Sequence, residues 1–94
     1  MPNTRERLHA VISGMVQGVY FRSTTETKAE QLGLTGWVKN LANGSVEVVA
    51  EGPRPVLQKL LAFLRQGPPG AHVTDVRVDW SAATGEFRLF EVRW

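Results

Sequence analysis

The sequence predicts an α+β fold, a two-layer sandwich with the element order βαββαβ and a short extra C-terminal strand. Two observations carry this prediction. Stretches with the two-residue period of a strand are interrupted twice by stretches with helical period. An Asn-Gly dipeptide joins two of the strand-like stretches. The chain of 94 residues fits a single domain over residues 1–94, with a mostly antiparallel sheet and two helices on one face.

The first strand is expected over residues 7–13. Leu8, Ala10 and Ile12 fall on one side, which is typical of a strand with one face more deeply buried. Residues 14–18 break this pattern and contain two glycines, which indicates a loop.

The first helix is expected over residues 21–32, with Gly33 just past its end. Its apolar face is thin because threonine and alanine carry part of it, so the helix depends on tertiary packing. The residues at helical spacing are Phe21, Thr25, Ala29 and Leu32.

Two further strands are expected over residues 37–41 and 45–50, joined by a tight turn. Asn43 and Gly44 form the turn, and both are expected to have positive φ angles because Asn-Gly favours such hairpins.

The second helix is expected to begin around Pro53 and Pro55 and to end sharply at residues 67–70. Its expected apolar stripe is Val56, Leu60, Phe63 and Leu64.

A fourth strand is expected over residues 76–80 and a short fifth strand near residues 87–94, with a loop around residues 84–85 between them. This order is that of a split β-α-β, or ferredoxin-like, sandwich. There the first two strands are parallel and the third lies between them. The loop at residues 14–21 should therefore approach Asn40, at the end of the second strand.

The loop at residues 14–21 has the features of an anion site. Gly14 and Gly18 let the backbone curl, consecutive N–H groups in such a curl can bind an anion, and a helix N-terminus follows. Arg22 then falls in the first helical turn, where its planar guanidinium suits two phosphate oxygens. The same residues would also suit a simple turn followed by a solvent-exposed arginine, and the spacing does not separate the two interpretations.

Residues 14–22, Gly-Met-Val-Gln-Gly-Val-Tyr-Phe-Arg, closely resemble the first signature of the acylphosphatase family. Residues 36–47, Gly-Trp-Val-Lys-Asn-Leu-Ala-Asn-Gly-Ser-Val-Glu, resemble the second. The resemblance spans essentially the whole chain. One departure is Met15, which follows Gly14 where the family often has a basic residue, so phosphate attraction is expected to be weaker.

This resemblance implies a hydrolase that cleaves the carboxyl–phosphate bond of acyl phosphates. It implies that Arg22 binds the phosphoryl group and that Asn40 orients the attacking water. It further implies no metal, no cofactor and no covalent phosphoenzyme, with inorganic phosphate as a product. The backbone amides expected to bind phosphate are those of Met15, Val16, Gln17, Gly18, Val19, Tyr20 and Phe21.

Other chemistry-bearing residues are expected to be structural. His9 and His72 stand too far apart to suggest a metal site, and Lys39 should face away from Asn40. No base accompanies the hydroxyls of residues 23–25, which are interpreted as helix-start and packing residues. Solvent-facing positions are expected for Glu47, Glu51 and Glu91, and packing positions for Trp37, Trp80 and Trp94.

Composition limits the alternatives. The chain has no cysteine, which excludes disulfides and a thiol nucleophile. No apolar run is long enough for a membrane span, and residues 1–7 are polar, so a cytoplasmic monomer is expected. The 11 basic residues are scattered, which argues against nucleic-acid binding. Two alternatives stay open: a single-stranded nucleic-acid-binding module and a domain that binds phosphate or acyl phosphate without turnover.

Overall fold

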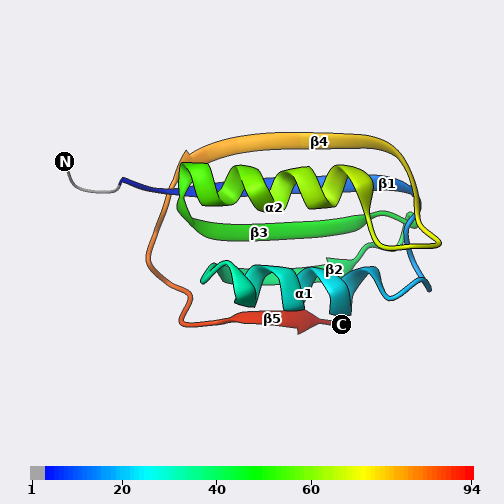
Figure 1. Ribbon diagram of the computed structural model, residues 1–94, viewed down its shortest axis with the longest axis horizontal. Coiled ribbons are helices and arrows are strands. Elements are labelled where there is room, and N and C mark those ends of the chain that lie inside the picture. Colours follow the sequence, from blue (N-terminus) through cyan, green and yellow to red (C-terminus); the bar gives the residue numbers. More distant parts are fainter. Residues whose placement is uncertain (1–3) are drawn as a thin grey trace.

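The computed structural model describes residues 4–94, so the first three residues of the polar stretch 1–7 lie outside the described residues. The predicted order of elements is confirmed (Figure 1). Strand β4 is longer at both ends than the predicted range 76–80. In chain order the elements are β1 (Arg5–Met15), α1 (Phe21–Gln31), β2 (Thr35–Asn40), β3 (Val46–Pro53), α2 (Arg54–Gln66), β4 (His72–Ala82) and β5 (Phe90–Arg93).

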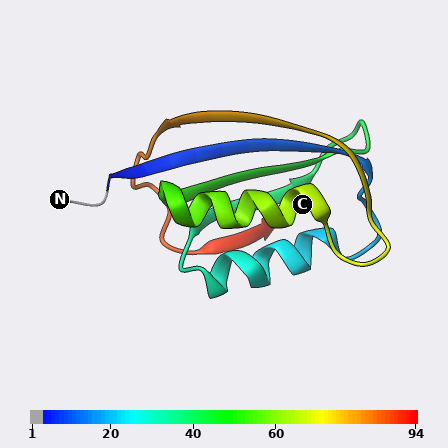
Figure 2. The same cartoon turned by 45° about the horizontal axis from the view of Figure 1, so that its top comes forward.

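One five-stranded sheet has the order β4-β1-β3-β2-β5. Strand β3 pairs antiparallel with both β1 and β2, as predicted, whereas β5 adds to β2 in parallel. Because β1 and β2 share the antiparallel neighbour β3, they run in the same direction and end at the same edge of the sheet. Both helices cover one face of this sheet (Figure 2). The fold therefore brings the loop after β1 close to the end of β2.

The core lies between the helices and this face of the sheet. Leu8, Ala10 and Ile12 are fully buried, which confirms the predicted inner face of β1. Helix α1 has the thin buried face expected for it, made by Phe21, Thr25 and Ala29. It is anchored by Phe21, whose ring packs against Phe63 of α2 at a centroid distance of 6.4 Å.

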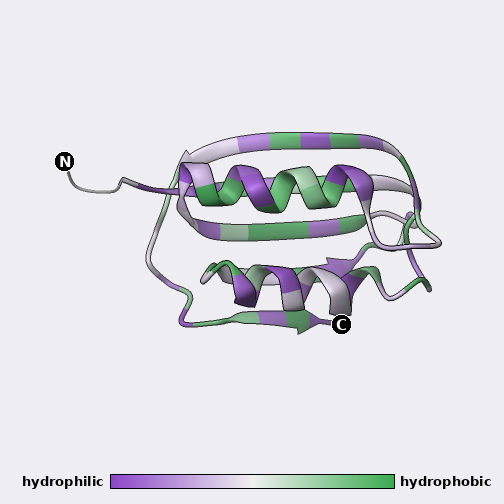
Figure 3. Ribbon diagram, viewed as in Figure 1, coloured by the Kyte–Doolittle hydropathy of each residue, from purple (hydrophilic) through white to green (hydrophobic). Residues whose placement is uncertain are grey.

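Helix α2 buries a stripe that overlaps the one predicted. Leu60 and Leu64 are fully buried as predicted, whereas Val56 and Phe63 are only partly buried, although both pack against the core. The helix is turned so that two neighbouring leucines take the central positions, and hydrophobic and hydrophilic residues alternate along its ribbon (Figure 3). The buried residues are Leu57, Leu60, Leu61 and Leu64.

The β2–β3 hairpin differs from the predicted turn. Gly44 has a φ angle of 93°, but Asn43 does not have a positive φ angle. The Leu41 N–H donates to the Ser45 carbonyl at 2.8 Å, which encloses a three-residue loop. Such a loop needs only one left-handed residue, at its last position. Asn43 contributes through its side chain instead, because its Oδ1 accepts from the Ser45 N–H at 3.0 Å.

Glu51 was expected to face solvent, and this expectation is wrong. It lies on the predicted outer face of β3, but its side chain is only 1% exposed because the connection from β4 to β5 passes over it. Its carboxylate accepts from Arg7 Nε at 2.8 Å and from the N–H groups of Thr84 and Gly85, each at 3.0 Å. Burial raises the pKa of this carboxyl, but these hydrogen bonds outweigh burial and leave the pKa below its ordinary value.

Candidate active site

The loop between β1 and α1 has an unusual backbone. Gly14 has a φ angle of 125°, and a Cβ there would fall on the His72 carbonyl of β4. Gly18 has a φ angle of 77°, and Tyr20 has one of 62°, in the left-handed region that aromatic residues rarely adopt. Residues held in such a conformation cost of order 1–3 kcal/mol and gather at ligand-binding sites. The loop is therefore held in one particular curl before the helix begins.

Hydrogen bonds hold Tyr20 in this conformation. Its carbonyl accepts from the Thr24 N–H at 3.0 Å and from the hydroxyls of Ser23 and Thr24 at 3.2 and 2.7 Å. The expectation that these hydroxyls belong to the helix start is confirmed. The Tyr20 side chain itself is 83% exposed.

Gln17 joins this loop to the β2–β3 hairpin. Its Nε2 donates to the carbonyls of Leu41 and Ser45, each at 2.8 Å. Leu41 directly follows Asn40, so the Gln17 amide fixes the loop against the end of β2. The sequence predicted a backbone role for Gln17 and did not reveal this side-chain contact.

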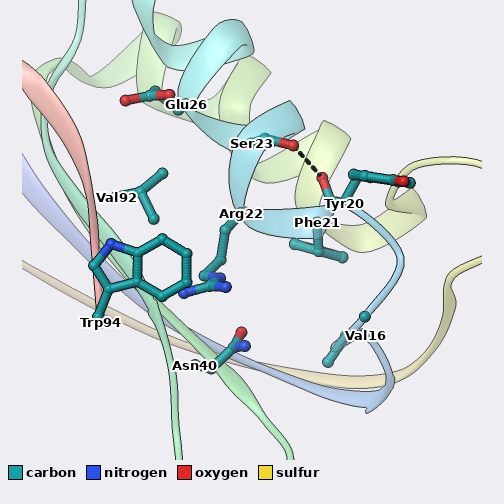
Figure 4. Close-up of a pocket in the computed structure, with 10 residues that line it drawn as sticks. Val16, Tyr20, Phe21, Arg22, Ser23, Glu26, Asn40, Val92 and Trp94 are labelled. Atoms are coloured by element: carbon teal, nitrogen blue, oxygen red, sulfur yellow. Dashed lines mark hydrogen bonds between the residues drawn. The ribbon is translucent and has the colours of Figure 1, made fainter.

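Arg22 lies in the first turn of α1 and points toward Asn40 (Figure 4). Its guanidinium stacks on the Trp94 ring, with Cζ 4.0 Å from the ring centroid, and Nη1 lies 3.4 Å from the Arg93 carbonyl. The cations in the ion pairs among residues 4–94 are Arg7, His9, Lys39, Arg54 and Arg93, and none of these pairs includes Arg22. A guanidinium without a carboxylate partner keeps its donors available for an anion.

Asn40 is the last residue of β2 and lies on the helix side of the sheet, on the same face as the buried Val38. Within residues 4–94, the hydrogen bonds around the loop do not involve the Asn40 amide, which points toward the Arg22 guanidinium (Figure 4). Lys39 lies on the opposite face as predicted, with Nζ 4.0 Å from Glu47 Oε1. The topology therefore brings together the two residues singled out in the sequence.

Arg22 and Asn40 line a pocket of about 570 Å³. Four of the seven residues predicted to bind phosphate through their amides also line it, namely Val16, Gly18, Tyr20 and Phe21. Met15, Gln17 and Val19 are outside the lining, and Met15 is largely exposed at the end of β1. The remaining lining residues are Ser23, Glu26, Val92 and Trp94.

Trp94 was expected to be a packing residue, and this expectation is wrong because it is not buried. Its side chain is 93% exposed and lines the pocket directly after β5. Phe90, Val92 and Trp94 alternate toward α1. Only Phe90 is fully buried, whereas Trp94 lies beside the first turn of α1, where the cover given by the helix ends.

The two histidines do not line the pocket. His9 Nε2 lies 2.7 Å from Glu47 Oε2, and Nδ1 lies 3.8 Å from Asp79 Oδ2, on the outer face of the sheet. Across residues 4–94, no three His, Cys, Asp or Glu side chains gather in a way that could hold a metal ion. Neither described helix is long and apolar enough to cross a membrane.

Comparison with known proteins gives a consistent result. The family model described as acylphosphatase matches residues 8–92. An acylphosphatase of Pelotomaculum thermopropionicum is 51% identical over 89 residues, which are 95% of this chain and 97% of the relative. One of Acaryochloris marina is 54% identical over 85 residues, 90% of each chain. The crystal structure of acylphosphatase from Bacillus subtilis has a TM-score of 0.91 and 35% identity, and the match covers 95% of this chain and 99% of that one.

Proposed function

The chain belongs to the acylphosphatase family, and on that premise we propose that it hydrolyses acyl phosphates to a carboxylate and inorganic phosphate. We also propose that residues 1–94 act as one acylphosphatase-like domain. The observation that best supports the reaction is the pair of Arg22 and Asn40. Their side chains point toward one another in a pocket that the curled loop also lines.

The role proposed for Arg22 is to bind the phosphoryl group together with loop amides. Phosphoryl transfer passes through a loose transition state, in which negative charge is spread over the equatorial oxygens. A guanidinium that has no carboxylate partner among the described residues can neutralise that charge without first breaking an ion pair. The helix N-terminus, where the loop joins α1, adds partial positive charge.

The role proposed for Asn40 is to hold the attacking water. Its side-chain carbonyl can accept a hydrogen bond from water, and its NH₂ group can donate one. The leaving group is already a stable carboxylate, so the attack needs orientation more than a strong base. A proton can then pass from the water to the phosphoryl oxygens of the substrate itself. The water attacks phosphorus, and the bond between phosphorus and the acyl oxygen breaks.

We further propose that this reaction needs no metal ion. The positive charge that divalent ions supply in many phosphoryl-transfer enzymes is here assigned to Arg22 and the loop amides. A monomer acting on a small acyl phosphate in the cytoplasm, without nucleic acid, is part of the same proposal.

The test is hydrolysis of benzoyl phosphate by the purified protein in the presence of EDTA. We expect rapid hydrolysis by the wild type and a loss of at least about 100-fold in kcat/KM for Arg22→Gln and for Asn40→Ala. Circular dichroism and thermal unfolding establish that both variants fold.

Near-normal turnover by either folded variant would refute the role proposed for that residue. Loss of wild-type activity in EDTA, with recovery on adding a divalent ion, would refute metal independence. A folded wild type that hydrolyses no acyl phosphate but binds inorganic phosphate would instead be a phosphate-binding module.

A further inference from the structure

The pocket has a second half that the phosphoryl site does not use. Trp94 and Val92 line it beside Arg22 and project from consecutive inward positions of the β5 segment. Figure 4 shows the Trp94 ring between Val92 and Asn40, with the Arg22 guanidinium against the ring. One end of the pocket therefore holds Arg22 and Asn40, whereas the other offers an indole ring and a valine, with the Glu26 carboxylate beyond them (Figure 4).

Trp94 is not buried, although most tryptophans in folded proteins are largely buried. Its side chain is 93% exposed, so it adds little to the core. A second arginine–tryptophan stack shows the contrast. Arg54 lies 3.9 Å from the Trp80 ring centroid, but Arg54 is also paired with Glu6 at 2.9 Å, and Trp80 packs against the core. The Arg54–Trp80 stack is structural, whereas the Arg22–Trp94 stack faces a cavity.

The direction of the reaction places the acyl group on the side of phosphorus away from Asn40. In an in-line displacement, the leaving group departs on the side of phosphorus opposite the attacking water. If Asn40 holds the water, the acyl group extends away from Asn40, into a pocket that Trp94, stacked on Arg22, and Val92 also line. An apolar, planar acyl group would lie against the indole there and lose its contact with water.

We propose that Trp94, with Val92, forms an acyl-group subsite that favours acyl phosphates with an aromatic acyl group over those with a small aliphatic one. This inference rests on the proposed function and specifies its substrate class. An aromatic acyl group can stack on the indole and an acetyl group cannot, so the subsite is expected to change discrimination by about tenfold.

The test compares kcat and KM for benzoyl phosphate and acetyl phosphate in the wild type, Trp94→Ala and Trp94→Phe. Trp94→Ala is expected to lower the ratio of the two kcat/KM values, benzoyl over acetyl, about tenfold, mainly through KM for benzoyl phosphate. Trp94→Phe keeps an aromatic face and should retain most of the ratio. Competitive inhibition by inorganic phosphate measures separately any loss that Trp94→Ala causes at the phosphoryl site through the stack on Arg22, and the ratio of the two kcat/KM values cancels a loss that both substrates share.

Trp80→Phe is the matched control, because it alters the other arginine–tryptophan stack and should leave the ratio unchanged. Thermal unfolding establishes that each variant folds. Equal losses for both substrates in Trp94→Ala, or an unchanged ratio in that variant, would overturn the acyl subsite while leaving the proposed function intact. A wild type that hydrolyses neither substrate would overturn the proposed function and the subsite with it.

Discussion

Two arginines at opposite ends of the molecule use the same chemistry in different ways. Arg7, near the start of β1, lies 2.8 Å from Glu51, 2.9 Å from Thr84 and 2.6 Å from Glu86, and it stacks over Phe87 at 5.2 Å. Arg22, beyond the end of β1, also stacks on an aromatic ring. Its Nη1 donates to the Arg93 backbone carbonyl at 3.4 Å.

The partners decide which arginine is structural. Two carboxylates and a hydroxyl occupy the Arg7 donors, so an incoming anion would have to displace them. Arg22 is oriented by a ring face, which leaves the edge of the guanidinium, where its N–H groups lie, open to phosphate oxygens. Stacking thus orients both side chains, and carboxylate pairing withdraws only Arg7 from binding.

Lysine substitution at each position should separate the two roles most strongly. Arg22→Lys keeps the charge but removes the planar pair of donors, and we expect kcat/KM for benzoyl phosphate to fall about 100-fold with little change in stability. Arg7→Lys should leave kcat/KM nearly unchanged and lower the free energy of unfolding by about 1 kcal/mol. Enzyme assays and urea unfolding of both variants provide the measurement. Equal effects of the two substitutions on activity would contradict the comparison.

Glu51→Gln should destabilise the end of the molecule around Arg7 and leave the pocket around Arg22 unchanged. The buried carboxylate accepts hydrogen bonds from Arg7, Thr84 and Gly85, and a neutral amide of the same size replaces these charge-assisted bonds poorly. We expect the free energy of unfolding to fall by about 2 kcal/mol. Urea unfolding measures this loss, and kcat/KM of the folded variant should match the wild type. If Glu51→Gln unfolded at the same urea concentration as the wild type, Glu51 would not be important for stability.

Acid should lower the free energy of unfolding because it protonates the same Glu51 carboxyl. Because the folded pKa of Glu51 is lowered, the stability that it contributes is present above the unfolded value of about 4.3 and is lost as the pH falls through the folded value. Unfolding free energies measured between pH 6 and pH 3 should therefore decline below about pH 4. The decline should be shallower in Glu51→Gln, whereas parallel curves for the two proteins would refute this assignment.

Met15→Lys should strengthen the binding of phosphate near Arg22, and this is the smallest effect that we expect. Met15 is exposed beside the loop, where an added positive charge would attract an anion without entering the pocket lining. We expect inorganic phosphate to inhibit about threefold more strongly at low salt, with the difference shrinking as salt rises. Met15→Gln is the uncharged control, and a gain that does not depend on salt would argue against a charge effect.

Sequence reasoning succeeded where the governing interactions are local or topological. Alternation identified the inner face of β1, and strand order alone placed Asn40 beside the loop that precedes Arg22. It failed for Glu51 because alternation assigns a face, whereas burial of that face depends on residues 84–85, far along the chain. It failed for Trp94 for the opposite reason, since an inward-facing position was left without cover. The left-handed Tyr20 and the Gln17 contacts have no sequence period that would reveal them.

The position of β1 in the sheet has a consequence for when the pocket around Arg22 and Asn40 can form. Within this strand Leu8 pairs with Ala50 on one side and with Trp80 on the other, so both neighbouring strands come from much later in the chain. Contacts between residues so distant in sequence slow folding, because the chain must lose much of its freedom before they form. During synthesis, a nascent chain that already contains Arg22 and Asn40 still lacks β4, against which the Gly14 end of the loop is fitted. Arg22 and Asn40 lie in the first half of the chain, but the pocket around them is completed only by the last third.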